Sequence, residues 1–69
     1  MYRANYGNGE TGEPHQDIRD ARLDKWGRAA IVQYRTAIER HVGSGHWVIQ
    51  EPSRASQNGP VITELRGRS

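Results

Sequence analysis

The sequence contains no cysteine, no phenylalanine and one lysine, Lys25. Without cysteine the chain can form neither a disulfide nor a thiolate metal site, which fits a reducing compartment. No apolar run reaches the length of a membrane span or of a signal-peptide core. We therefore expect a cytoplasmic protein that does not contact a membrane.

Large apolar side chains are also scarce, because only 33% of the 69 residues are hydrophobic. A single domain of this length is near the lower limit of what folds unaided. Since disulfides and thiolate metal sites are excluded, the remaining way to complete a small core is association with a second copy or with another partner. The composition therefore favours a protein that binds something.

The first sixteen residues, MYRANYGNGETGEPHQ, contain three glycines, one proline and little that is apolar beyond Tyr2 and Tyr6. Such a composition offers too little apolar surface to repay ordering of the chain. We predict a flexible N-terminal arm over residues 1–16 and a folded domain over residues 17–69.

A long amphipathic helix is predicted over residues 17–42, where no proline interrupts a run with apolar residues at helical spacing. Asp17 is the expected N-cap and Gly43 the expected left-handed stop. Gly27 inside this run predicts a bend or a close backbone approach. The apolar stripe of this helix comprises Leu23, Trp26, Ala30, Ile31, Tyr34, Ala37, Ile38, His41 and Val42.

A β-hairpin is predicted after the glycine hinge at residues 43–45, with HWVIQE as its first strand and PVITELR as its second. Trp26 and Trp47 are then the expected anchors between helix and hairpin, while Val48 and Ile62 point away from the helix. The predicted fold is a small α+β domain of order α-β-β. Both hairpin edges are unpaired, so a symmetric dimer through the hairpin is an expected way to complete the core.

Candidate partner-binding residues are the outward apolar pair and a set of arginines: Val48, Ile62, Arg28, Arg35, Arg54, Arg66 and Arg68. Arginine suits contacts with carboxylates, phosphates and aromatic faces, although a G+C-rich genome also produces an arginine bias. The basic residues of the helix are interrupted by acidic ones and the net charge is only +2. We therefore expect a protein partner first, and DNA or RNA bound through arginines as the alternative.

No arrangement of residues predicts catalysis, a metal site or a cofactor. The three histidines match no zinc spacing and have no cysteine beside them. Gly43-Ser44-Gly45-His46 resembles a short stretch of small ribonuclease toxins of the HicA type, which implies a histidine-dependent ribonuclease as a weaker alternative. The main prediction is a non-enzymatic binding protein, an inhibitor or accessory regulator of the kind common in phages and other mobile elements.

Overall fold

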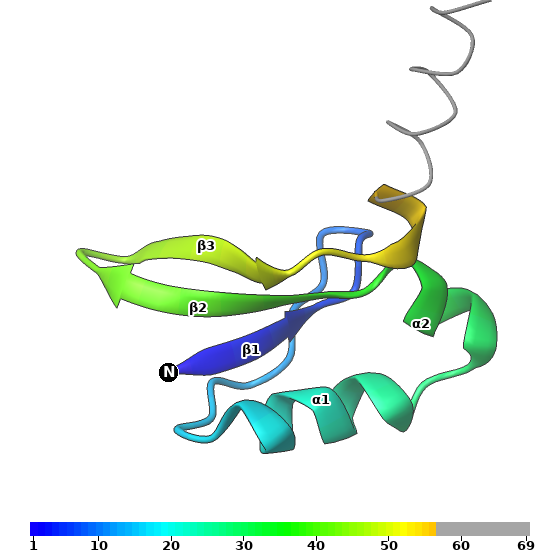
Figure 1. Cartoon of the computed structure of the whole chain (residues 1–69), viewed down its shortest axis with the longest axis horizontal. Helices are drawn as coiled ribbons and strands as arrows, with labels where there is room; N and C mark the ends of the chain where they lie inside the picture. The colour runs from blue at the N-terminus through cyan, green and yellow to red at the C-terminus, as the bar shows by residue number, and fades with distance from the viewer. Residues whose placement is uncertain (57–69) are drawn as a thin grey trace, which may run out of the picture.

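The structure of the protein is a computed structural model, and it is described for residues 1–56. Three strands form one antiparallel sheet of order β1-β2-β3, and two helices connect β1 to β2 (Figure 1). Residues 54–56 are also helical. The elements are β1 (Tyr2–Asn5), α1 (Ile18–Trp26), α2 (Ala30–Arg35), β2 (Ala37–Gly43) and β3 (His46–Glu51). The α+β class is confirmed, whereas the order is β-α-α-β-β and not α-β-β.

The predicted helix over residues 17–42 is wrong in extent. Asp17 caps α1 as predicted, since its side chain accepts a hydrogen bond from the backbone N–H of Arg19. Gly27 ends α1 after nine residues, α2 has only six, and residues 37–43 form a strand.

Within residues 1–56, no helix is long and apolar enough to cross a membrane.

The reason for the change from helix to strand lies in the turn between β2 and β3. Ser44 and Gly45, the two residues of this turn, have φ values of 53° and 74°. Positive φ at both central residues is what a two-residue type I′ hairpin turn requires. HWVIQE is a strand as predicted, but it pairs with β2, because the glycine segment closes a hairpin and does not cap a helix.

The second predicted strand, residues 60–66, lies outside the described residues, as do the candidate binding residues Ile62, Arg66 and Arg68. The hairpin that the structure does show is made by β2 and β3, and β3 forms one outer edge of the sheet (Figure 1).

The N-terminal segment, expected to be a flexible arm, is part of the sheet. β1 pairs with β2 in the register that places Ala4 opposite Ile38. Residues 10–15 then return along the outer edge of β1, and backbone N–H groups of Tyr2, Tyr6, Gly12 and His15 take part in hydrogen bonds of 2.7–2.9 Å between the two segments. Backbone pairing therefore orders a segment that has few large apolar side chains.

A very small core lies between α1 and the sheet. Its fully buried apolar members are Ala4, Tyr6, Ala21 and Ile38. Most large apolar side chains are instead exposed, among them Leu23, Trp26, Ile31, Tyr34, Val42, Val48 and Ile49. The helix stripe read from the sequence is thus largely a surface, and Trp26, with 59% of its area exposed, does not anchor helix to hairpin.

The face of the sheet opposite α1 carries Trp47, because alternation along β2 and β3 puts it on the side away from Ile38. The guanidinium of Arg3 lies 4.1 Å from the centre of a Trp47 ring, and the His41 ring lies 5.0 Å away on the same face. The Arg3 Nε also donates to Glu39 at 2.8 Å. Trp47 therefore packs against polar side chains of the sheet and is not the predicted contact between hairpin and helix.

Candidate protein-binding surface

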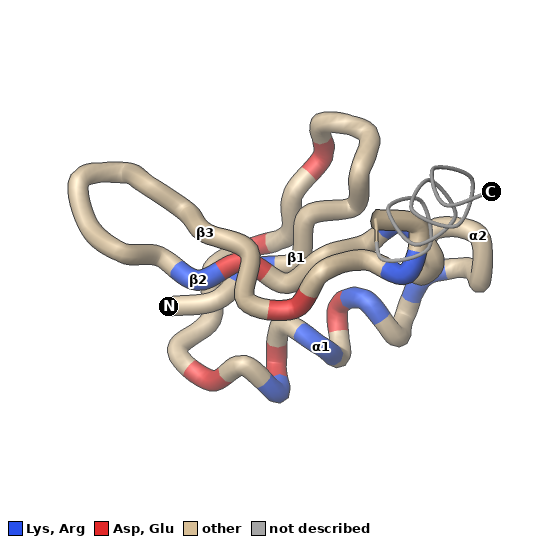
Figure 2. The backbone as a smooth tube through the Cα atoms, turned by 45° about the horizontal axis from the view of Figure 1, so that its top comes forward, with Lys and Arg blue, Asp and Glu red and all other residues tan. Residues whose placement is uncertain are grey.

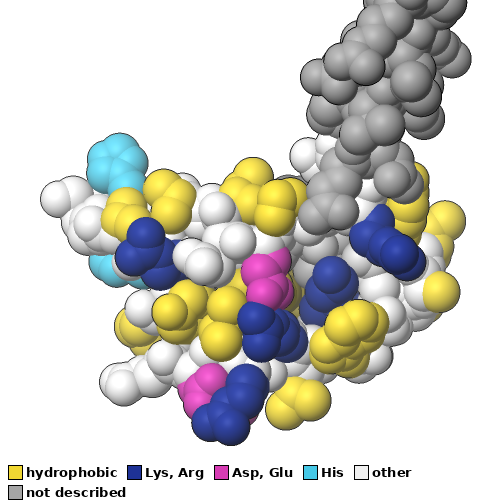
Figure 3. All heavy atoms as spheres, viewed as in Figure 1, with side chains coloured by type: hydrophobic (Ala, Val, Ile, Leu, Met, Phe, Trp, Pro, Cys, Tyr) yellow, Lys and Arg dark blue, Asp and Glu magenta, His cyan; other side chains and the backbone are white. Residues whose placement is uncertain are grey.

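A hollow of about 610 Å³ opens where the end of α1, the helix α2 and the residues after β3 meet. We call it the aromatic hollow. It is lined by Lys25, Trp26, Ala30, Gln33, Tyr34, Glu51, Pro52 and Arg54. In the view of Figure 3, hydrophobic and basic side chains lie next to one another on the surface around these elements.

The shape of the aromatic hollow depends on how α1 meets α2. The side-chain amide of Gln33 donates to the carbonyls of Trp26 at 3.2 Å and of Arg28 at 2.7 Å. The first bond satisfies a carbonyl at the end of α1 that the helix itself leaves unpaired, and the second satisfies a carbonyl in the link between the two helices. They fix the turn between the helices, and so they hold Trp26 of α1 and Tyr34 of α2 on the same hollow.

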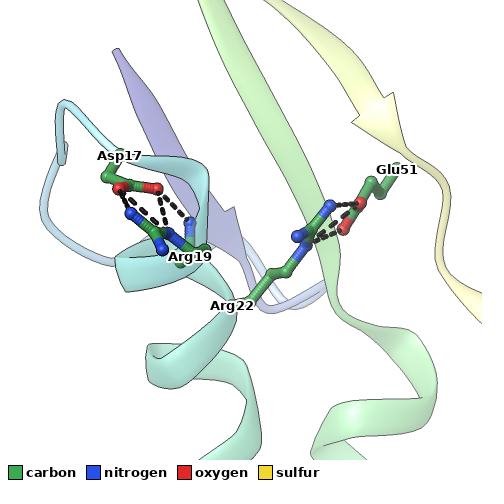
Figure 4. Close-up of polar contacts among 4 residues, drawn as sticks. All are labelled: Asp17, Arg19, Arg22 and Glu51. Atoms are coloured by element: carbon green, nitrogen blue, oxygen red, sulfur yellow. Dashed lines mark hydrogen bonds and ion pairs between the residues drawn. The ribbon is translucent and has the colours of Figure 1, made fainter.

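The opposite wall is held by an ion pair between α1 and β3. Arg22 donates to both carboxylate oxygens of Glu51 through Nε, at 3.1 Å each, and Nη2 adds a third contact (Figure 4). Hydrogen bonding to this guanidinium lowers the pKa of Glu51 below its ordinary 4.5. Glu51 is therefore an anion whose charge is already balanced by Arg22 of the same chain.

Arg19 and Asp17, also drawn in Figure 4, form a separate ion pair at the start of α1. Hydrogen bonding to Arg19 lowers the pKa of Asp17 to about 2.

Two basic residues that line the aromatic hollow are not held in an ion pair of this kind within residues 1–56. Lys25 and Arg54 form no ion pair with any other residue between 1 and 56; the Lys25 ammonium lies 5.4 Å from a Trp26 ring centre. Exposed aromatic area beside unmatched positive charge suits a ligand that combines an apolar group with a carboxylate.

Of the arginines proposed from the sequence, Arg28 and Arg35 are engaged within the chain. Arg28 lies over the Tyr6 ring at 4.1 Å and donates to Glu10 at 3.2 Å, while the Arg35 Nε donates to the Tyr6 carbonyl at 2.8 Å. Both hold the N-terminal segment against the helices. A binding role for them stays a prediction. Among the candidate arginines of residues 1–56, Arg54 is the one that lines the aromatic hollow.

Charge along α1 alternates between basic and acidic residues, as Figure 2 shows. Most arginines in the described part of the chain are matched by a carboxylate, in the pairs Arg3–Glu39, Arg19–Asp17, Arg22–Glu51 and Arg28–Glu10. A surface that binds phosphates usually presents an uninterrupted basic patch. Most arginines of residues 1–56 therefore form ion pairs within the fold.

Val48, the remaining candidate, is not at the aromatic hollow. It lies in β3, 41% exposed, opposite Arg40 of β2. It is brought together with neither Arg54 nor the aromatic side chains of the hollow, so it marks a second and separate surface.

A smaller polar hollow of about 290 Å³ lies beside β1 and includes a histidine that sequence reasoning passed over. The Nε2 of His15 lies 2.7 Å from Oδ2 of Asp24, and this hydrogen bond raises the pKa of His15 above its ordinary 6.5. A Cβ added at Gly12 would come within 3.1 Å of the Tyr6 hydroxyl and 3.2 Å of that same carboxylate oxygen. The pair ties residues 10–15 to α1, and no motif in the sequence could have indicated it.

His46, on which the ribonuclease alternative rests, is exposed at the first position of β3. Its side chain makes no hydrogen bond, ion pair or ring contact with another described residue. General acid–base catalysis requires a second positioned group near the histidine. Residues 1–56 also contain no group of three or more acidic or histidine side chains that could hold a metal ion.

Comparison of the chain with protein-family models, with curated proteins and with solved structures finds no match. A function for this chain must therefore be inferred from the arrangement of residues on its surface.

Proposed function

We propose that this chain is a small non-enzymatic binding protein that acts by protein–protein interaction, as an inhibitor or accessory regulator in the cytoplasm. The observation that carries the proposal is the aromatic hollow, where exposed Trp26 and Tyr34 lie beside Lys25 and Arg54, two cations that form no ion pair with another residue between 1 and 56. Its ligand is a segment of a partner protein that presents an apolar side chain next to an aspartate or glutamate.

Energetics support a binding role for this surface. Covering the exposed area of Trp26 would contribute on the order of 3 kcal/mol before the costs of association. Tryptophan, tyrosine and arginine are the residues that most often dominate binding energy at protein interfaces. Among residues 1–56 only four apolar side chains are buried, whereas Trp26, Tyr34 and Arg54 lie together on one hollow and are partly open to solvent.

The alternative of a DNA- or RNA-binding regulator has less support, because most arginines in the described part are matched by carboxylates. The ribonuclease alternative has less support still, since His46 contacts no acidic or basic side chain among residues 1–56. Self-association through the hairpin, expected from the sequence, would use a second surface and is independent of the aromatic hollow.

Photo-crosslinking tests the role of the aromatic hollow. We would place benzoylphenylalanine at position 34, inside the hollow, and as a control at position 8, in the exposed turn after β1, in the cells that make the protein. The expected result is an adduct at position 34 only, resistant to nuclease. It should be lost in the double variant Lys25→Glu, Arg54→Glu and retained in Arg19→Glu, which reverses an arginine charge outside the hollow.

Two results would contradict the proposal. An adduct that nuclease removes would assign the surface to nucleic acid. Adducts of equal yield from positions 34 and 8, or an adduct unaffected by the double charge reversal, would show that the aromatic hollow does not select the partner.

A further inference from the structure

The two outer edges of the sheet differ in whether another segment of residues 1–56 covers them. The outer edge of β1 is covered by residues 10–15, which bond to it through backbone groups. The outer edge of β3, by contrast, has no strand beside it among residues 1–56. An edge of this kind presents a row of unpaired N–H and C=O groups, which is a template for another strand.

The side chains of β3 also suit pairing. Val48 and Ile49 are both exposed, on opposite faces of the sheet, and neither carries a charge that would keep another strand away. The blocking features found on protected edges, namely lysine, proline or an inward-pointing charge, are missing from the stretch Trp47–Val48–Ile49.

From this asymmetry we propose that two copies of the protein pair β3 against β3 in antiparallel orientation and form one continuous six-stranded sheet. This inference rests on the proposed function only in assuming that the protein works through protein contacts. It uses a different surface from the aromatic hollow, and the occupant it commits to is a second copy of this chain.

The register of the pairing follows from symmetry. A two-fold axis normal to the sheet keeps each face on its own side, so a residue must pair with one of the same parity in the partner. An axis at Val48 places Val48 opposite the partner's Val48 and Trp47 opposite the partner's Ile49. The face without helices would then carry a continuous apolar row of Trp47 and Ile49 from both copies.

Neighbouring registers fit less well. The pairing of β2 with β3 shifts between Ile38–Glu51 and Glu39–Ile49, so Gln50 is an extra residue that alters the alternation of faces. An axis at Ile49 would set Trp47 against the partner's Glu51, which the bulge places on the other face and which Arg22 already binds. An axis at Trp47 would bring the turn residue Gly45 into the ladder. Only the axis at Val48 keeps residues 47–49 of both copies in regular pairing.

The test exploits the self-contact at Val48. Paired residues of an antiparallel ladder have their Cβ atoms about 4.5–5.5 Å apart. Val48→Lys and Val48→Glu should therefore each self-associate much more weakly than wild type when alone, because like charges meet, and should form a mixed dimer when combined in equal amounts. Ile31→Lys is the matched control, since it introduces the same charge at a 75% exposed apolar position of α2 and should leave self-association unchanged.

Sedimentation equilibrium of the full chain between about 10 μM and 1 mM measures the outcome, with circular dichroism confirming that each variant is folded. We expect wild type and Ile31→Lys to dimerise, each charged variant alone to bind itself at least tenfold more weakly, and their mixture to recover dimer. A monomeric wild type at 1 mM with a concentration-independent melt would overturn the dimer. Dimers in which Val48→Lys and Val48→Glu behave as wild type would overturn the register.

The two proposals fail separately. Loss of the β3–β3 dimer would leave crosslinking at position 34 unaffected, and absence of a crosslinked partner would leave the sedimentation result unaffected.

Discussion

The N-terminal segment and the helix α2 are a useful comparison, because their burial is the reverse of their hydrophobicity. Residues 1–16 are polar and rich in glycine, yet they contribute Ala4 and Tyr6 to the core. α2, with the sequence AIVQYR, is far more apolar and buries no residue completely. Position in the hydrogen-bonded sheet, more than the apolar content of a segment, decides what is buried in a domain of this size.

Removing residues 1–16 should have the largest effect on stability of all the changes that test this comparison. A chain that starts at Asp17 lacks β1, the segment that covers its edge, and two of the four buried apolar side chains found among residues 1–56. We expect it to show no cooperative thermal transition by circular dichroism, since so small a domain has little stability to spare. A melt within a few degrees of full length would show that residues 1–16 are a dispensable arm after all.

Replacing one aromatic residue by alanine in each region should change the free energy of unfolding by very different amounts. Tyr6→Ala removes a ring that is 3% exposed and lies under Arg28, and it should cost about 3 kcal/mol of unfolding free energy. Trp26→Ala removes a larger but exposed ring and should change that free energy by no more than about 0.5 kcal/mol. Urea denaturation of both variants checks this. Equal losses would mean that Trp26 is packed in solution.

Two glycines of the N-terminal segment provide a sharper contrast within one loop. Gly7 and Gly9 have φ values of 82° and 89°, so a side chain at either position meets the strain of a left-handed conformation, about 1–2 kcal/mol. A Cβ at Gly7 would also come within 2.7 Å of the Arg35 carbonyl oxygen, whereas a Cβ at Gly9 would have no atom within 4 Å. Gly7→Ala should therefore destabilise the protein by at least about 1 kcal/mol more than Gly9→Ala. Matching urea midpoints for the two variants would contradict the close approach.

The smallest expected effect is a dependence on pH. The pKa of His15 is raised in the folded protein by its hydrogen bond to Asp24, so the folded state holds the proton more tightly than the unfolded chain does. This contribution to stability is fully present below the ordinary pKa of 6.5 and is lost as the pH rises through the raised value. Thermal melts between about pH 5.5 and 8.5 should show that loss for wild type and a flatter dependence for Asp24→Asn. An unchanged slope in the variant would assign it to another group.

Parts of the fold follow directly from local sequence signals. Asp17 followed by a charged first turn predicted the start of α1, and the alternation in HWVIQE predicted β3. Both signals depend on neighbours in the chain, which is why they could be read without a structure.

The remainder depends on contacts between distant segments. The stripe of Leu23, Trp26, Ile31 and Tyr34 has helical spacing whether it faces a core or solvent, so periodicity alone could not tell a buried face from a binding surface. Ala4 gives no hydrophobic signal, and it is buried because a small residue fits where α1 crosses β1. The Ser44-Gly45 turn was a sequence signal that the helix prediction overlooked. Because apolar segments lie on either side of it, this turn indicates a hairpin more strongly than the end of a helix. The pairing of His15 with Asp24 left no pattern at all.

The tight turn at Ser44 and Gly45 has a consequence for the order in which the protein folds. It joins β2 to β3 over two residues, and short hairpins of this kind close within microseconds. β1 must instead find β2 across the whole of α1 and α2, and closing so long a loop is slow and entropically costly. During synthesis β1 can therefore pair with residues 10–15 at an early stage, but its pairing with β2, and the placing of Ala4 opposite Ile38, must wait until residues 37–43 have emerged.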